Sequence, residues 1–276
     1  MNSDTKILFS DLDGTLLTTD KRISDENLKA IHTLIDAGHK FVFVTGRPAV
    51  SGINIAREYG LLKSGFFVVG YNGAVIYDVG AGKNIYTCPL SYEDMRFLLD
   101  EGKGKDFGAL TYTHTHVIGE VEHEALVAYS KGLMMPYMIV DNCEVKLKEE
   151  GYEPYKVIIS TLKGRHLLEE FKAFIDPVVG ERLYTLITSD VLLEIGPADV
   201  SKGRAIEALC KKLEVPLENS YATGDESNDL SMIKAAGHGI AMANAIDELK
   251  ALAEFTTAND NDHNAIAEVV EGMVKS

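Results

Sequence analysis

The N-terminal part of the chain alternates short apolar runs with amphipathic segments, and this alternation constrains the fold more than any other feature. Three apolar runs have the length and composition of buried strands: 7–9, 40–44 and 66–70. Two segments between them have helical patterning: Asp25 to Ala37, with Ser24 as its N-cap, and Ala49 to Tyr59. Strand, helix, strand, helix, strand at this spacing predicts a parallel sheet with helices on its faces.

The pattern changes near Gly80 and returns after Pro197. In between, threonines alternate with tyrosine and histidine side chains within residues 109–118, which predicts a half-exposed antiparallel strand. Further elements are expected there: helices at 91–101, 122–131 and 166–175, and strands at 155–160, 183–188 and 191–195. We therefore expect an α/β chain with a Rossmann-like core at 1–86 and 196–276, and an inserted α+β unit at 87–195.

The second outer segment repeats the alternation of the first one. A helix is expected at 202–213, a strand at 221–224, a helix near 227–236 and a strand at 239–242. Near the end of the first outer segment, Asn72-Gly73 lies between apolar runs and could also turn a β-hairpin.

Composition and charge limit the possible partners. The chain has 276 residues, of which 46% are hydrophobic and 25% charged, so it is globular rather than disordered. Its net charge of −15 opposes binding to nucleic-acid backbones and to anionic lipid. The same field would repel a phosphorylated substrate, so a site for one must carry local cations or a metal ion.

The three cysteines, Cys88, Cys143 and Cys210, are far apart and lack a CxxC spacing. Their number and spacing argue against a disulfide framework and against a cysteine zinc site. The N-terminal residues lack the basic and apolar regions of a signal peptide, and no apolar run is long enough for a membrane span. These features predict a cytoplasmic protein, which we expect to be a monomer or a weak homodimer.

Polar stretches end strands or open helices at four places in the two outer segments. They are Asp11/Asp13, Thr45-Gly46-Arg47, Ser201-Lys202-Gly203 and Gly224 to Asp229. Singly, each has a simpler interpretation, as a turn, a solvated helix start or a helix cap. In one parallel sheet, however, three of them share an edge, where ligands bind in such folds. Carboxylates there suit Mg²⁺, and the threonine and lysine supply donors for a phosphoryl group.

Together these stretches resemble the four motifs of the haloacid dehalogenase superfamily of phosphatases. The match is to Asp11-Leu12-Asp13-Gly14-Thr15-Leu16, Thr45-Gly46-Arg47, Lys202 and Gly224-Asp225-Glu226-Ser227-Asn228-Asp229. Supporting stretches at 71–74, 193–195 and 240–245 are similar to the Cof-like branch, subfamily IIB. In that branch an α/β cap lies between the second and third motifs, where the insertion falls here.

The resemblance implies a role for each matching residue. Asp11 would attack phosphorus as the nucleophile, and Asp13 would protonate the leaving oxygen and then activate water. The metal ligands would be Asp11, Asp225 and the backbone carbonyl of Asp13, with Asp229 helping through a water molecule or from the layer of residues around the direct ligands. The phosphoryl group would be bound by the remaining members of the set: Thr45, Gly46, Arg47, Lys202 and Asn228. Asn228 would contact the phosphate or orient Lys202.

Two positions depart from the family pattern, and one requirement follows from the mechanism. Glu226 stands where an asparagine is usual, so it is expected to add a carboxylate near the metal. Residues 262–267 replace an Asp-Gly-Val-Ala stretch, which affects only the expected local backbone. Asp13 must be protonated at the first step, which predicts a locally tuned carboxyl group.

The inserted unit is expected to select the substrate, because the family's cap closes over the cleft and excludes water. Candidates for substrate contact are Tyr112, His114, His116 and Arg47, although Arg47 could instead form a structural salt bridge. The His114-x-His116 pair could in principle bind zinc, but exposed strand histidines are the favoured interpretation.

The expected activity is a Mg²⁺-dependent phosphatase for small phosphorylated metabolites, such as sugar or cofactor phosphates. A phosphosugar mutase with the same nucleophile is the first alternative. A non-catalytic phosphate-binding protein is the second, and the presence of a nucleophile counts against it. A dehalogenase is disfavoured, because Asp13 would have no leaving oxygen to protonate.

Overall fold

The computed structural model describes residues 4–104, 106–133 and 135–275. The chain divides into two compact units, of which the first contains Met1–Thr87 and Ser201–Ser276. The second unit is Cys88–Val200, a single insertion between the two parts of the first.

The first unit is built on an eight-stranded sheet in the order β14-β13-β12-β1-β2-β3-β4-β5. The strands that alternate with helices in the sequence pair in parallel, from β14 through β3, and β4 and β5 add an antiparallel end. Their bounds are β1 (Ile7–Asp11), β2 (Lys40–Val44), β3 (Phe66–Gly70), β4 (Val75–Asp78), β5 (Lys83–Thr87), β12 (Ser220–Gly224), β13 (His238–Ala241) and β14 (Phe255–Thr256). The predicted α/β fold with a Rossmann-like central sheet is confirmed.

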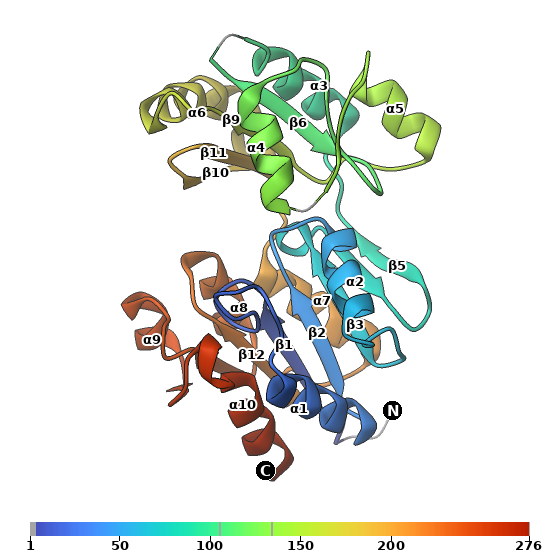
Figure 1. Ribbon diagram of the computed structural model, residues 1–276, viewed down its shortest axis with the longest axis vertical. Helices are drawn as coiled ribbons and strands as arrows, with labels where there is room; N and C mark the ends of the chain where they lie inside the picture. The colour runs from blue at the N-terminus through green and yellow to red at the C-terminus, as the bar shows by residue number, and fades with distance from the viewer. Residues whose placement is uncertain (1–3, 105, 134, 276) are drawn as a thin grey trace. The chain divides into compact units, whose positions relative to one another are not determined.

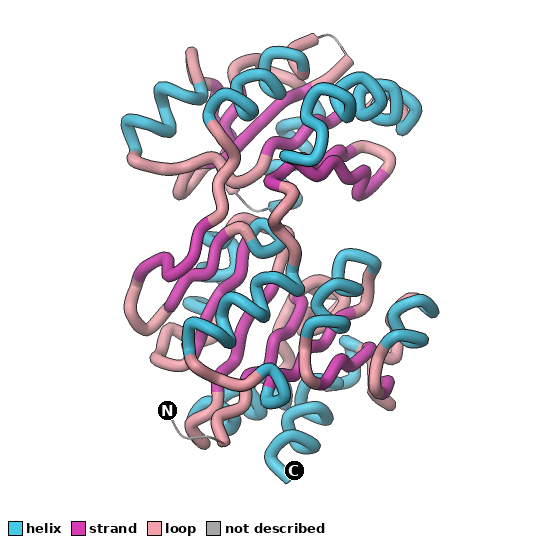
Figure 2. Tube along the Cα trace, turned by 180° about the vertical axis from the view of Figure 1, so that it is seen from behind, coloured by secondary structure: helices cyan, strands magenta, loops and turns pink. Residues whose placement is uncertain are grey.

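Helices cover both faces of this sheet. They are α1 (Asp25–Asp36), α2 (Ala49–Glu58), α7 (Lys202–Leu213), α8 (Leu230–Ala235), α9 (Asp247–Leu252) and α10 (Ala265–Lys275). Figure 1 shows α1 and α10 side by side in front of the sheet, and Figure 2 shows helices over the opposite face. Burial on both sides explains why β1, β2 and β3 read as continuous apolar runs rather than alternating ones. The predicted cap Ser24 accepts a hydrogen bond from the Asn27 backbone N–H and starts α1.

The chain reverses its direction of progress across the sheet between β1 and β12. From β1 it proceeds through β2 to β3 on one side, and from β12 through β13 to β14 on the other. Both strands run parallel, with Ile7 opposite Ser220 and Ser10 opposite Thr223, so their carboxyl ends lie together. In open α/β sheets this switch point is where ligands bind.

The turn after β3 forms a hairpin, which confirms the alternative drawn from Asn72-Gly73. β3 pairs with β4 in antiparallel register, with Gly70 opposite Val75. Tyr71, Asn72 and Gly73 all have positive φ, of 53°, 57° and 117°. Gly73 is required there, because a Cβ would lie 2.4 Å from the backbone oxygen of Ser201, just before α7.

The second unit has its own six-stranded sheet in the order β10-β11-β9-β6-β7-β8. The strands are β6 (Gly108–Tyr112), β7 (Val117–Gly119), β8 (Tyr137–Ile139), β9 (Val157–Ser160), β10 (Leu183–Ser189) and β11 (Leu192–Pro197). Its helices are α3 (Tyr92–Glu101), α4 (Glu124–Leu133), α5 (Cys143–Glu150) and α6 (Arg165–Val179). All pairings are antiparallel except that of β7 with β8, so this unit differs in architecture from the first.

The predicted single strand at 109–118 is wrong. β6 ends at Tyr112 and β7 begins at Val117, and the two pair with each other. The hydroxyl of Thr113 accepts hydrogen bonds from the backbone N–H groups of Thr115 and His116, which folds the segment into a turn. The prediction of a half-exposed strand also fails, since Thr111 and Tyr112 are both buried.

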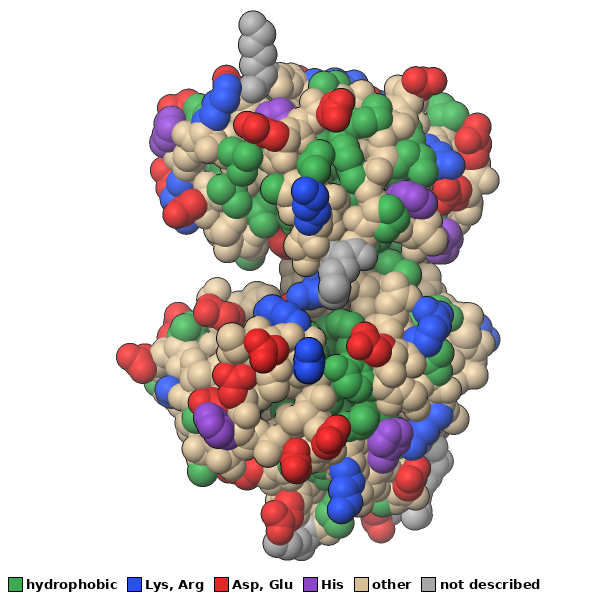
Figure 3. Space-filling model, in the orientation of Figure 1, with side chains coloured by type: hydrophobic (Ala, Val, Ile, Leu, Met, Phe, Trp, Pro, Cys, Tyr) green, Lys and Arg blue, Asp and Glu red, His purple; other side chains and the backbone are tan. Residues whose placement is uncertain are grey.

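The surface is consistent with a globular chain of high negative charge. On the face shown in Figure 3, Asp and Glu side chains are scattered, with Lys and Arg between them, rather than gathered in one patch. The three cysteines form no disulfide with one another, and Cys143 and Cys210 are buried. None of the described helices has the length and apolar character needed to cross a membrane.

Candidate active site

A buried lysine lies at the centre of the site. Lys202 is the first residue of α7, whose N-cap Ser201 accepts a hydrogen bond from the Arg204 backbone N–H. Its side chain is 1% exposed, and its Nζ donates to Oδ1 of Asp11 and to Oδ1 of Asp229, both at 2.6 Å. The lysine thus joins the end of β1 to the segment that follows β12.

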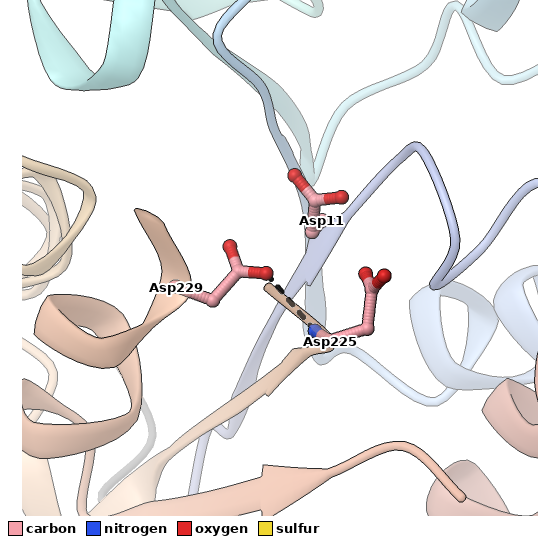
Figure 4. A group of neighbouring side chains, drawn as sticks. All are labelled: Asp11, Asp225 and Asp229. Atoms are coloured by element: carbon pink, nitrogen blue, oxygen red, sulfur yellow. Dashed lines mark hydrogen bonds between the residues drawn. The ribbon is translucent and has the colours of Figure 1, made fainter. Parts of the chain in front are cut away.

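Asp11, Asp225 and Asp229 form a group that we call the acidic cluster. One carboxylate oxygen from each lies within 4.8 Å of the others, and all three residues are buried. Figure 4 shows them around the place where β1 and β12 end. Asp229 also accepts hydrogen bonds at Oδ2 from the backbone N–H groups of Asp225 (3.0 Å) and Glu226 (3.1 Å), which fixes its orientation. The structure brings these three predicted residues together.

Thr15 and Gly14 hold Asp225 in place. The Thr15 hydroxyl donates to Oδ1 of Asp225 at 2.6 Å, inside the protein. Gly14 has φ of +82°, and a Cβ on it would lie 2.3 Å from Oδ2 of the same carboxylate. Only glycine therefore allows the turn after Asp13 to lie against Asp225. Sequence reasoning gave Thr15 no role, although it lies inside the first motif.

The electrostatics of the acidic cluster favour an added cation. Burial raises the pKa of Asp11 to about 8; Lys202 lowers it, and the neighbouring carboxylates Asp229 and Asp225 raise it further. Burial likewise raises the pKa of Asp225 to about 6, against the hydrogen bond from Thr15. Attraction to Asp11 and Asp229 outweighs burial and raises the pKa of Lys202, which keeps it charged. Two of the three carboxylates, Asp11 and Asp229, share one ammonium group, and the oxygen donors of the cluster suit a hard divalent cation such as Mg²⁺.

Asp13 stands outside the acidic cluster and is held by two cations. Arg47 donates to both of its oxygens, from Nε to Oδ2 at 2.8 Å and from a terminal nitrogen to Oδ1 at 2.7 Å. Lys21, which sequence reasoning missed, donates to Oδ1 at 2.7 Å. Burial raises the pKa of Asp13, but the bonds from Arg47 and Lys21 outweigh it and leave the pKa below its ordinary value. The expectation that the surroundings of Asp13 favour its protonated form is therefore wrong for this arrangement. Of the two roles considered for Arg47, the structure shows the salt bridge, formed with Asp13.

Thr45 and Gly46 lie at the end of β2, the strand beside β1. Thr45 is buried, and its hydroxyl accepts a hydrogen bond from the Arg47 backbone N–H at 3.1 Å. The Asn72 backbone N–H donates to the Thr45 carbonyl at 3.0 Å, so the turn after β3 supports this segment. A Cβ on Gly46 would lie 3.0 Å from Oδ1 of Asn72, which shows how closely the two turns approach.

The short helix η4 (Ser227–Asp229) places the remaining predicted residues of the fourth motif. Glu226 is its N-cap and forms a capping box with Asp229, and its carboxylate is not part of the acidic cluster. The charge of Glu226 nevertheless contributes to the raised pKa of Asp225, so an added carboxylate near the metal stays a prediction. Asn228 is exposed, and the side chain that holds Lys202 from this segment is Asp229. A phosphate contact by Asn228 stays a prediction.

The candidates in the second unit pack against their own neighbours. The His114 ring lies 4.2 Å from the ring of Tyr152, measured between centroids. His116 bonds through Nδ1 to the Thr115 hydroxyl at 2.8 Å, and the hydroxyls of Tyr112 and Tyr129 are hydrogen-bonded. His114 and His116 lie on the turn and not on one strand face, so the geometry assumed for a zinc pair is wrong.

Residues 8–270 match the family described as haloacid dehalogenase-like hydrolase. A putative phosphatase of Bacillus subtilis, YkrA, is 30% identical over 99% of this chain and 100% of its own length. A second protein of that organism, 5-amino-6-(5-phospho-D-ribitylamino)uracil phosphatase YwtE, is 29% identical over 98% of each chain. A haloacid dehalogenase-like hydrolase from Bacteroides thetaiotaomicron superposes with a TM-score of 0.89 at 25% identity, covering 98% of this chain and 99% of that one.

Proposed function

The chain belongs to the haloacid dehalogenase-like hydrolases and is a phosphatase, and from this premise we propose the chemistry of its site. We propose that it hydrolyses monoesters of small phosphorylated metabolites, with Mg²⁺ bound and through an aspartyl-phosphate on Asp11. The observation that carries the proposal is Lys202, buried and hydrogen-bonded at 2.6 Å to both Asp11 and Asp229.

Asp11 has the surroundings of a nucleophile. It is buried at the carboxyl end of β1, so that attack on phosphorus takes place away from bulk water. Lys202 holds Oδ1 in a fixed direction and offsets the charge that accumulates when an anionic carboxylate approaches an anionic phosphate. The buried Thr45 and the Gly46 amide, at the end of the adjacent strand β2, are proposed to bind the phosphoryl oxygens.

Asp13 is proposed as the group that moves protons. Its carboxylate is partly exposed, with 37% of its side-chain surface accessible, in contrast to buried Asp11. Exposure lets it meet a leaving oxygen or a water molecule, whereas Arg47 and Lys21 fix its direction. In the second step its ionised carboxylate takes the proton of the water that attacks phosphorus, the bond from phosphorus to Asp11 breaks, and phosphate leaves.

The acidic cluster is proposed as the Mg²⁺ site. Asp11, Asp225 and Asp229 would hold the ion, with the Asp13 carbonyl as a further ligand, and the ion would supply positive charge to the phosphoryl oxygens. Asp229 contributes in a second way, because it fixes Lys202 and the backbone around Asp225.

The names of the relatives support a proposal for the substrate class. One relative is named for a phosphorylated ribitylamino-uracil, and others are named only as phosphatases. We therefore propose sugar phosphates and phosphorylated cofactors or their precursors as substrates. The second unit, Cys88–Val200, is proposed as the cap that discriminates among them.

A screen for phosphate release tests the proposal. The wild-type protein with Mg²⁺ is incubated with sugar phosphates, pyridoxal phosphate, flavin mononucleotide and p-nitrophenyl phosphate. Asp11→Asn is expected to lose at least about a thousandfold of the activity, because the amide cannot attack phosphorus.

Asp36→Asn serves as the matched control, because Asp36 is an exposed aspartate paired with Lys63 in the same unit. It is expected to retain full activity. Absence of phosphate release from every ester, or equal activity in Asp11→Asn and the control, would defeat the proposal. Isomerised sugar phosphate without phosphate release would favour the mutase.

A further inference from the structure

The loop Thr18–Arg22 carries Lys21 to Asp13. Two backbone hydrogen bonds close it, from the Thr18 N–H to the Arg22 carbonyl at 2.9 Å and from the Lys21 N–H to the Thr18 carbonyl at 2.8 Å. Lys21 has φ of +60°, in the left-handed region of the backbone that residues other than glycine rarely adopt. The surrounding structure must therefore hold the loop in this conformation, in which Lys21 Nζ lies 2.7 Å from Oδ1 of Asp13.

Asp262, near the C-terminal end of the chain, holds the loop from outside. Its Oδ1 accepts the backbone N–H of Thr19 and its Oδ2 accepts the Thr19 hydroxyl, both at 2.7 Å. Its own backbone N–H donates to Oδ1 of Asp260 at 3.0 Å. A carboxylate that accepts two hydrogen bonds from one residue fixes that residue in direction as well as distance.

The neighbouring asparagines hold the chain between Asp13 and this loop. Asn261 donates from Nδ2 to the Leu17 carbonyl at 3.0 Å, and Asn244 donates from Nδ2 to the Gly14 carbonyl at 2.8 Å. Asn244 Oδ1 also accepts the backbone N–H of Asn261 at 3.2 Å, so the two asparagines are joined. The backbone on both sides of the turn is thus anchored, and Asp262 is hydrogen-bonded to the loop that carries Lys21.

Stability alone does not explain such an arrangement. Asp262 and Thr19 are exposed, and hydrogen bonds or ion pairs in such positions add little to the free energy of folding. The hydrogen bonds to Thr19 instead determine the position of Lys21, which follows Thr19 by two residues in the same tight turn. Lys21 in turn determines the direction of the Asp13 carboxylate.

We propose that Asp262 is a positioning residue for the reaction: through Thr19 it holds the loop on which Lys21 orients Asp13 for proton abstraction from water. The inference rests on the proposed function, because it concerns the second step, in which Asp13 acts in its ionised form. Lys21 and Arg47 donate hydrogen bonds to the ionised Asp13 carboxylate and thereby fix its orientation.

Kinetics with p-nitrophenyl phosphate test this assignment. Its leaving group departs without a proton, so the first step, which sets kcat/KM, needs no help from Asp13. In Asp262→Ala and in Lys21→Met, kcat is expected to fall about tenfold while kcat/KM stays within about twofold. A burst of nitrophenolate approaching one per enzyme is expected, because Asp11 stays phosphorylated. A parallel fall of kcat and kcat/KM, or no change in either, would overturn the proposal.

The double variant tests the path through Lys21. If Asp262 acts through Lys21, Asp262→Ala has no further effect on kcat in the Lys21→Met background. If the kcat losses of the two single variants multiplied in the double variant, Asp262 would not act through Lys21, and the proposal would be overturned. Thr19→Ser keeps both donors to Asp262 and is expected to behave as wild type, whereas Thr19→Val removes the hydroxyl and is expected to lower kcat.

Amide hydrogen exchange gives a readout that needs no turnover. Asp262→Ala is expected to speed exchange at the Thr19 amide, and Lys21→Met is expected to leave it unchanged. Unchanged exchange in Asp262→Ala would overturn the inference even in an active phosphatase. Lack of activity in the wild type would defeat the proposed function instead, so the two failures are distinguishable.

Discussion

Two clusters of charged side chains, one buried in the first unit and one partly exposed in the second, differ in their balance of carboxylates and cations. In the first unit, the acidic cluster has three carboxylates, and two of them, Asp11 and Asp229, contact Lys202. In the second unit, Glu120 is contacted by Arg96 and Lys103 and accepts the backbone N–H of Cys143 at 2.7 Å. Asp100, which also contacts both cations, completes a group of two carboxylates and two cations.

The pKa values show what this difference means. Although burial raises the pKa of Glu120, hydrogen bonds from Arg96 and Lys103 lower it to about 2. In the acidic cluster, burial and like charges raise the pKa of Asp11 to about 8 in spite of Lys202. We therefore expect the cluster around Glu120 to need no further ion, whereas the surplus of carboxylates in the acidic cluster supports the proposed cation site.

Removing a cation is expected to give the largest contrast between the clusters. Lys202→Met removes the ammonium group that is bonded to Asp11 and Asp229 and leaves the buried acidic cluster without this countercharge, so we expect the free energy of unfolding to fall by about 3–5 kcal/mol. Arg96→Met leaves Glu120 bonded to Lys103 and the Cys143 N–H, so a loss of about 1–2 kcal/mol is expected. Urea unfolding near pH 7 measures both. Equal losses would contradict the difference in balance.

Adding a divalent cation is expected to separate the clusters next. Saturating Mg²⁺ should stabilise the wild type by about 2–3 kcal/mol, measured as a rise in melting temperature, when its concentration is about a hundredfold above Kd. In Asp225→Asn the shift should disappear, and the metal-free melting temperature should rise, because a buried like charge is gone. Glu120→Gln is the matched control and should keep the Mg²⁺ shift. A shift retained in Asp225→Asn would place the ion elsewhere.

Lowering the pH is expected to have the smallest effect on stability, and to act through Glu120 in the second unit. The pKa of Glu120 is lowered in the folded state, so its contribution to stability is complete above its unfolded pKa, about 4.5. That contribution is lost as pH falls from there toward about 2. Melting temperatures between about pH 5 and pH 3 should therefore fall more steeply in wild type than in Glu120→Gln. Parallel curves would show that the cluster is not stabilising.

Much of the fold was predictable, because local signals in the first unit agree with its packing. The helix predicted at 202–213 is α7 as observed, since Ser201 caps it and its buried positions recur at helical spacing. The second unit was less predictable. α5 mixes Lys and Glu with few buried residues, and β8 has three residues, so neither has a clear period. The turn at Thr113 could not be predicted from the sequence pattern, because it depends on one hydroxyl group that accepts hydrogen bonds from two backbone N–H groups.

The site was predictable as far as motifs name residues, but the partners of those residues were not. Thr15 meets Asp225 across 210 positions in the sequence, and Lys202 meets Asp11 across 191. Such contacts depend on the order of strands in the sheet, which periodicity does not report. The substitution at 262–267 is explained locally: Asn264 has φ of +67°, a conformation that asparagine tolerates better than most residues.

Trapping the reaction on the protein tests most directly whether the acidic cluster is a site of chemistry. Wild-type protein and Mg²⁺ are mixed with a substrate found in the screen, quenched in acid within the first turnover, and digested for mass spectrometry. We predict a phosphoryl group on Asp11, in the peptide that also carries Asp13, and none in Asp11→Asn. Turnover with an unmodified Asp11, or a phosphoryl group on another residue, would contradict the assignment of Asp11 as the nucleophile.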